Sequence, residues 1–115
     1  WSTIRDDDVG VLWEHFVLNE LHSRLQTRDI RYWRDKRQHE VDFIYQRRGK
    51  PPAAIECKWT AGEFDARDLA AFRRSYPRGA NYVVARDVRR SYQRTVAGLK
   101  VEFVGPQGLV ERLRG

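Results

Sequence analysis

The chain has 115 residues, enough for one hydrophobic core, and its 41% hydrophobic and 33% charged content excludes an intrinsically disordered protein. It has no run of about 18 apolar residues, which excludes a membrane-spanning helix and a membrane partner, and its single cysteine, Cys57, excludes an internal disulfide and favours the reducing cytoplasm. The net charge of +6 rests on 18 arginines and 4 lysines, which indicates either a nucleic-acid partner or a G+C-rich genome, and both interpretations stay open.

The first predicted element is a helix over residues 9–25, preceded by Asp6, Asp7 and Asp8 as N-cap and first-turn acids. This helix is apolar nearly all round. Glu14 is the exception, because Leu18 and Leu21 fall within about 40° of it on the helical wheel. An acid on an apolar stripe is unusual for a surface helix, and Glu14 is therefore a candidate functional residue.

Strand-like runs and one further helix follow. The connections between the first three runs are short, which predicts antiparallel pairing. A helix over 65–76 directs Arg67, Arg73 and Arg74 outward and leads to a parallel crossover. The predicted fold is an α/β domain over residues 1–115, with a mixed central sheet flanked by helices. Its strands cover 30–34, 39–46, 53–59, 81–85 and 101–104, and a short terminal helix covers 109–113.

Three charged residues interrupt two of these apolar strands. Asp42 lies in the second strand, and Glu56 and Lys58 lie two positions apart on one face of the third. By strict alternation Glu40, Asp42 and Ile44 share one face, while Val41, Phe43 and Tyr45 share the other.

If the second and third strands are neighbours, Asp42 approaches Glu56 and Lys58 across the ladder. Asp42 and Glu56 would then hold Mg²⁺ or Mn²⁺, which activates water, and Lys58 would orient that water or offset charge in the transition state. Phosphodiester hydrolysis is the reaction that such a site serves. The alternative is a salt-bridge ladder on a solvated sheet face, which in a chain so rich in charge arises by chance.

Four motifs follow one another along the chain: Gly10–Val17, Tyr32–Asp35, Glu40–Phe43 and Ile55–Lys58. Their order resembles the PD-(D/E)XK nuclease superfamily, which includes restriction endonucleases and archaeal Holliday-junction resolvases. More narrowly, the motifs resemble the C-terminal domain of a large group of prokaryotic AAA-type ATPases. The likeness runs from about residue 9 to 85.

The resemblance implies a restriction-endonuclease-like α-β-β-β-α-β core and a metal-dependent nuclease acting on DNA. It places Glu14, Asp42, Glu56 and Lys58 in the catalytic positions and an ATPase module upstream, and a homodimer is a further arrangement to test. The chain begins at Trp1 and lacks methionine, which agrees with a piece of a longer ATPase. The second hypothesis is a non-catalytic module of the same fold that binds nucleic acid or protein for the ATPase.

The remaining candidates are assigned mainly to structure. Trp13 and Trp33 are expected in the core, Cys57 as a small buried residue, and His39 as structural. Glu40 shares the predicted face of Asp42 and is expected to form a salt bridge, with a role beside or at the metal as the alternative. The turn between the second and third strands is basic and could grip phosphates, through Arg47, Arg48 and Lys50.

Overall fold

The computed structural model describes residues 6–27 and 29–115, with side chains from Asp8 onward. The predicted capping of the first helix by Asp6 and Asp7 therefore concerns side chains outside those described. The described chain folds into helices and strands in this order: α1 (Asp6–Leu25), β1 (Ile30–Arg34), β2 (Glu40–Tyr45), β3 (Ala53–Lys58), the 3-10 turn η1 (Ala61–Glu63), α2 (Arg67–Ser75), β4 (Asn81–Ala85), β5 (Tyr92–Val96), β6 (Leu99–Val104) and α3 (Pro106–Arg114).

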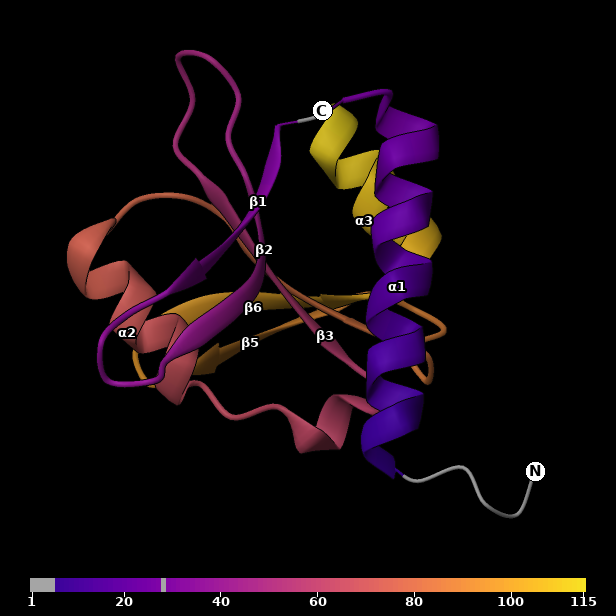
Figure 1. Cartoon of the computed structure of the whole chain (residues 1–115), viewed down its shortest axis with the longest axis horizontal. Coiled ribbons are helices and arrows are strands. Elements are labelled where there is room, and N and C mark those ends of the chain that lie inside the picture. Colours follow the sequence, from indigo (N-terminus) through magenta and orange to yellow (C-terminus); the bar gives the residue numbers. More distant parts are fainter. Residues whose placement is uncertain (1–5, 28) are drawn as a thin grey trace.

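The strands form one six-stranded sheet in the order β1-β2-β3-β4-β6-β5. The pairs β1–β2, β2–β3 and β5–β6 are antiparallel, whereas β3–β4 and β4–β6 are parallel because a helix or hairpin returns the chain between them. Helices α1 and α3 lie side by side on one face, and α2 lies on the other (Figure 1). The predicted α/β class with a mixed, helix-flanked sheet is confirmed. None of the described helices is long and apolar enough to cross a membrane.

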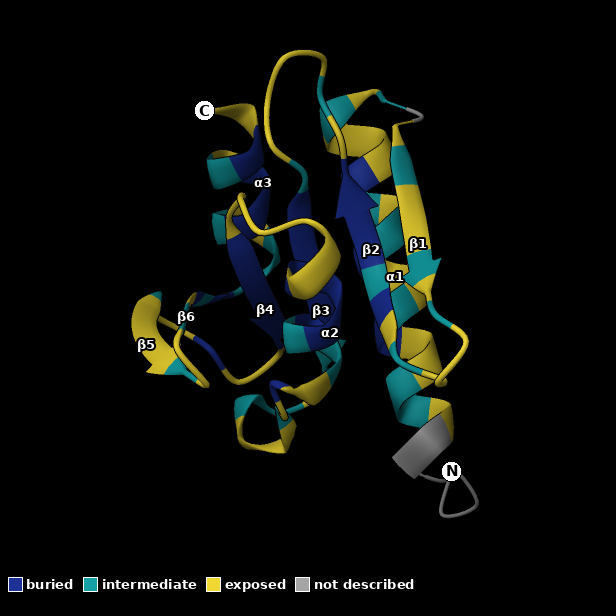
Figure 2. Ribbon diagram, turned by 90° about the vertical axis from the view of Figure 1, so that its left-hand side faces the viewer, coloured by how far each residue is buried: buried dark blue, intermediate teal, exposed yellow. Residues whose placement is uncertain are grey.

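Two hydrophobic clusters, one on each face of the sheet, hold the layers together. On one face α1 contributes Trp13, Val17 and Leu21, which pack with α3 against the sheet. On the other face α2 contributes Leu69 and Phe72. Strands β3 and β4 run between the two layers and are buried along most of their length (Figure 2). Trp13 is in the core as predicted, and Trp33 packs partly buried against the α2 cluster.

Strand β2 contains an irregularity that the strict alternation did not foresee. Two steps along β1, from Arg31 to Trp33, correspond to three steps along β2, from Ile44 to Val41. Such a bulge places two consecutive side chains on the same side. The prediction that Val41 and Phe43 share a face is therefore wrong, since Val41 joins Ile44 in the α2 cluster while Phe43 joins the α1 cluster.

Strand β5 was not predicted. Its five residues, Tyr92–Val96, are exposed at all but the last position, so the sequence shows no alternation of apolar and polar residues. It pairs along its whole length with β6 through a tight turn. Ala97 and Gly98 both have positive φ, 52° and 76°, as the commonest two-residue hairpin turn requires.

Arg73, predicted to point outward from α2, is buried at 5% exposure. Its Nε donates to Asn81 at 2.7 Å, and its two Nη groups donate to four backbone carbonyls. The helix ends where β3 and β4 begin, and the guanidinium satisfies the carbonyls of that junction. Gly79 completes it, because a Cβ there would lie 2.0 Å from the carbonyl oxygen of Pro52.

Candidate active site

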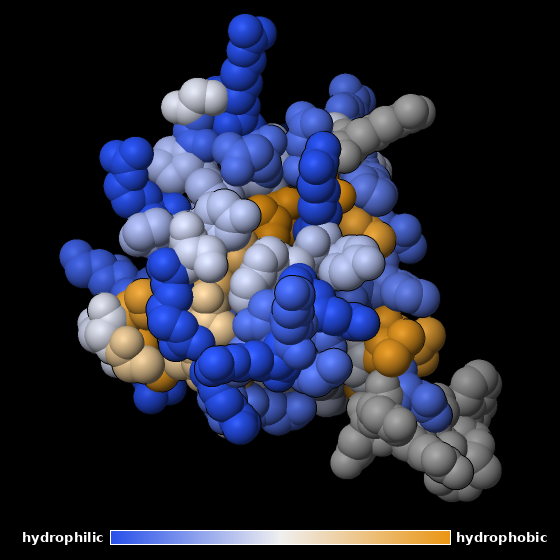
Figure 3. All heavy atoms as spheres, turned by 60° about the vertical axis from the view of Figure 1, so that its left-hand side comes forward, coloured by the Kyte–Doolittle hydropathy of each residue, from blue (hydrophilic) through white to orange (hydrophobic). Residues whose placement is uncertain are grey.

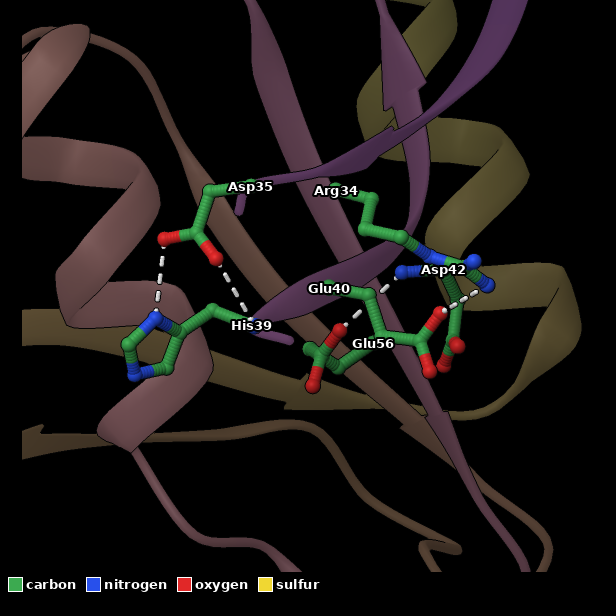
Figure 4. Close-up of polar contacts among 6 residues, drawn as sticks. All are labelled: Arg34, Asp35, His39, Glu40, Asp42 and Glu56. Atoms are coloured by element: carbon green, nitrogen blue, oxygen red, sulfur yellow. Dashed lines mark hydrogen bonds and ion pairs between the residues drawn. The ribbon is translucent and has the colours of Figure 1, made fainter. Parts of the chain in front are cut away.

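The candidate site lies where β2 and β3 separate, a point that we call the fork. The ladder between them ends at the pair Phe43–Ile55. Beyond it, side chains take over the hydrogen bonds of the strands. The backbone N–H of Asp42 donates to Oε1 of Glu56 at 3.1 Å (Figure 4), and the backbone N–H of Cys57 donates to Oδ2 of Asp42 at 2.7 Å. Each carboxylate is therefore fixed by the backbone of the opposite strand.

Glu56 is the most buried acid of the site, with 3% of its surface exposed. Burial, followed by the charge of Asp42, raises the pKa of Glu56 to about 8. Burial also raises the pKa of Asp42 to about 6, against the hydrogen bond from Cys57, which lowers it. Two desolvated carboxyl groups in contact through the strand backbone thus resist carrying two negative charges at neutral pH.

Glu14, on α1, is near enough for its charge to act on Asp42. Burial raises its pKa, and the charges of Glu40 and Lys58 act on it as well. Glu14 in turn raises the pKa of Asp42 through repulsion. Lys58, half-buried at the end of β3, is the positive charge that favours ionisation of all three acids, Glu14, Asp42 and Glu56. The four residues that the sequence singled out therefore influence one another electrostatically, and that they form one catalytic site stays a prediction.

Glu40 is a fourth carboxylate at this end of the sheet. Its Oε2 accepts a hydrogen bond from Nη2 of Arg34 at 3.0 Å, and both side chains are more than half exposed (Figure 4). The predicted salt bridge of Glu40 is confirmed. Its partner was missed, although Arg34 and Glu40 flank a short hairpin turn and pair in register. The charge of Glu40 also opposes ionisation of Glu14 and Asp42.

His39 belongs to a different contact. Its Nδ1 lies 2.8 Å from Oδ2 of Asp35, and the other carboxylate oxygen of Asp35 accepts from two backbone N–H groups of the turn, those of Arg37 and His39. In Figure 4 the imidazole ring points away from Asp42 and Glu56. The assignment of His39 to structure is confirmed. Cys57 is mostly buried, and burial holds the pKa of its thiol well above the ordinary value, which does not suit a nucleophile.

The donor set at the fork decides which metal would suit it. In the part of the chain that the structure describes, no three His, Cys, Asp or Glu side chains are grouped as metal ligands. A zinc site with four protein ligands therefore does not fit. Asp42 and Glu56 supply two hard carboxylate donors, and Mg²⁺ commonly uses one or two carboxylates while it keeps several waters. These two residues fit a hydrated Mg²⁺ or Mn²⁺.

The basic turn lies at the opposite end of the β2–β3 hairpin from this fork. Tyr45 pairs with Ala53 just before the turn, three positions and about 10 Å from Asp42 along the strand. Arg47 and Lys50 contact the carbonyl oxygen of Gly115 at 3.4 Å. Arg47, Arg48 and Lys50 are thus not gathered with the acids, and only a ligand that extends along the hairpin would contact both groups.

Together these features define a small mixed α/β domain in which two buried carboxylates, those of Asp42 and Glu56, are held side by side at one end of the sheet. Residues 9–101 match the family described as "Domain of unknown function (DUF4143)", and the chain belongs to this family. No curated protein matches it in sequence.

The fold is similar to that of one chain in a solved structure from Thermococcus gammatolerans, a half-complex from a tetradecameric assembly of McrB AAA+ hexamers with bound McrC. The TM-score is 0.59 at 11% sequence identity, and the match covers 93% of this chain and 33% of that chain. This chain therefore spans about a third of the length of the solved chain. At this identity the likeness concerns the fold alone.

Proposed function

We propose that this domain is a Mg²⁺- or Mn²⁺-dependent nuclease of the PD-(D/E)XK superfamily that hydrolyses phosphodiester bonds in DNA. The observation that carries the proposal is the reciprocal pair of hydrogen bonds at the fork, in which the backbone of each strand holds the carboxylate of the other. It fixes Asp42 and Glu56 next to each other, with Lys58 and Glu14 within electrostatic reach.

The order of elements supports the same assignment. From α1 to β4 the chain runs helix, three strands, helix, strand, which is the order that the resemblance implies for a restriction-endonuclease-like core. The first three strands are antiparallel and the fourth runs parallel to the third. The hairpin β5–β6 extends this core at the edge away from β1, and α3 packs against β4 and β6.

Each residue of the cluster has a proposed task. Asp42 and Glu56 hold the cation, which would lower the pKa of a bound water and offset the negative charge that develops on the phosphate. Lys58 orients the attacking water or stabilises developing charge from the third strand. Glu14 adds a fourth polar group from α1. Because Glu56 holds its proton near neutral pH without a metal, cation binding would release that proton.

We further propose that the domain is the C-terminal module of a cytoplasmic AAA-type ATPase. The support is the fold likeness to a chain about three times as long from an assembly of AAA+ hexamers, together with the motifs of the ATPase-linked family. In this arrangement the ATPase would deliver or remodel DNA, and the domain would cut it.

A homodimer is a separate proposal, which light scattering of the purified domain tests.

One observation favours a second candidate, a non-catalytic module that binds nucleic acid or protein. Glu56 is almost fully buried and already accepts a backbone hydrogen bond, so part of the cluster already has a structural partner. A binder, however, gains little from a lysine whose charge acts on three carboxyl groups.

The two candidates are separated by a digestion panel of single-stranded, duplex and branched labelled DNA with Mg²⁺ or Mn²⁺. For a nuclease, Lys58→Ala lowers cleavage at least a hundredfold, about 3 kcal/mol of barrier, while affinity for DNA changes little. Asp42→Asn abolishes cleavage. The matched control is Lys100→Ala, an exposed lysine in β6. Cleavage that persists undiminished in purified Lys58→Ala contradicts the assignment of the site.

A further inference from the structure

A cleft of about 480 Å³ opens on the α2 side of the sheet, between the edge strand β1, strand β2 and the C-terminal end of α2. The side of the molecule that carries α2 is mostly hydrophilic, with hydrophobic and near-neutral side chains showing between the long polar ones (Figure 3). Its lining includes the aromatic residues Trp33, Phe72 and Tyr76 and the polar residues Asp29, Arg31 and Gln46.

Three of these rings contact one another and form a buried floor with one exposed wall. Phe72 is buried at 2% exposure, Trp33 meets its ring edge-on at 5.3 Å, and Tyr76 stacks on it at 5.0 Å. Tyr76 is 48% exposed and forms the wall. Exposed ring faces beside a buried aromatic floor suit a flat, ring-shaped ligand.

The cleft connects the two groups that the hairpin keeps apart. At one end Trp33 pairs in register with Val41, the residue before Asp42. At the other end Gln46 directly precedes Arg47 and Arg48, and its Nε2 donates to the carbonyl of Lys50 at 2.7 Å. A polymer that passes from the acid cluster to the basic turn would therefore run over the cleft.

We infer that the cleft binds an unpaired nucleobase of a single-stranded segment, with the adjoining phosphates directed toward the basic turn and the acid cluster. The inference rests on the proposed function and specifies its substrate. Aromatic side chains stack on the faces of bases, Arg31 supplies a positive charge for the backbone, and Gln46 offers an amide beside the edge of the base. In a duplex those faces are covered by neighbouring base pairs, so the cleft selects unstacked bases.

The test is binding, measured in EDTA so that no cleavage is needed. The probes are a labelled oligothymidine of twelve nucleotides, an abasic oligonucleotide of the same length and charge, and a duplex. Tyr76→Ala should weaken oligothymidine binding about tenfold and leave the abasic affinity unchanged, and Tyr76→Phe should restore it. Because Tyr76 is half exposed and follows the last residue of α2, the change should leave the fold intact, which circular dichroism checks. The control, Tyr92→Ala, removes an exposed tyrosine from the opposite edge strand and should leave the preference for bases unchanged.

The result that overturns the inference is an equal effect of Tyr76→Ala on the oligothymidine and the abasic probe, or no effect on either. Equal affinity of the wild-type domain for both probes, absence of binding to every probe, or occupation of the cleft by a peptide also overturns it. Tyr76-dependent binding without cleavage in Mg²⁺ or Mn²⁺ supports the inference and refutes only the proposed nuclease activity. The two failures are thus distinguishable.

Discussion

Replacing Glu56 by glutamine tests the electrostatics of the site without disturbing its shape. The two side chains have nearly the same size, and the amide oxygen of glutamine can still accept the hydrogen bond from the N–H of Asp42. What the substitution removes is a carboxyl group that burial and the charge of Asp42 make difficult to ionise. In the absence of metal we therefore expect Glu56→Gln to stabilise the protein, which is unusual for a change at a buried position.

The expected gain depends on pH with a definite sign. The folded-state pKa of Glu56 is about 8, above the ordinary value of 4.5, so between these values the folded protein keeps a proton that the unfolded chain has lost. The stability associated with this group is complete below pH 4.5, falls as the pH rises, and is lost above pH 8. At about 1.36 kcal/mol per pKa unit the total is at most about 5 kcal/mol. Glutamine, which does not titrate, avoids this loss.

The measurement is urea unfolding followed by tryptophan fluorescence at pH 5, 7 and 8.5 in EDTA. Glu56→Gln should equal the wild type near pH 5 and exceed it by several kcal/mol at pH 8.5, while Glu111→Gln, an exposed acid on α3, should track the wild type at every pH. Added Mg²⁺ should stabilise the wild type at pH 8.5 and not the variant. A difference between the two proteins that stays constant with pH, or a variant less stable at pH 8.5, refutes the argument.

Two further predictions follow from the same structure. Arg73→Lys should lower the free energy of unfolding by about 3 kcal/mol or more, because a lysine cannot supply the five donated hydrogen bonds to the helix–strand junction. The control is Arg74→Lys, at the exposed next position, which should change the free energy of unfolding by less than about 0.5 kcal/mol in the same urea titration. Mg²⁺ binding at pH 7 should release close to one proton, measured by calorimetry in buffers of different ionisation enthalpy. The proton release should vanish at pH 9 and in the variant Glu56→Gln. Heat of Mg²⁺ binding without proton release at pH 7 would contradict the raised pKa of Glu56.

The pairing of Asp42 with Glu56 was predictable because residues at equal distances from a hairpin turn lie opposite each other. Tyr45 pairs with Ala53 on either side of the turn, and equal steps away from the turn bring Asp42 opposite Glu56. The short turn, the alternation of the strands and the two acids within apolar runs were sufficient to place Asp42 and Glu56 opposite each other. Glu14 was found because an acid interrupts an apolar helical stripe.

Other features left no local signal. The bulge in β2 depends on how β1 pairs with it, so Val41 and Phe43 could not be assigned to opposite faces from their own spacing. Strand β5 lies at the edge of the sheet and is solvated on most positions, so propensity and alternation both fail there. Arg73 lies among exposed arginines in the sequence, and only the meeting of α2 with β3 and β4 buries it.

The hydrogen bonds at the fork bear on whether Asp42 and Glu56 serve the structure alone or also bind a metal. The β2–β3 ladder stops at the point where the next N–H groups donate to carboxylates, so the two acids replace two backbone acceptors. Asparagine and glutamine would accept the same hydrogen bonds without charge. Carboxylates there cost stability at neutral pH, because burial and mutual repulsion raise the pKa values of both groups. A purely structural role leaves that cost unexplained, whereas a bound divalent cation offsets it, and this asymmetry favours the metal-dependent function over the salt-bridge ladder.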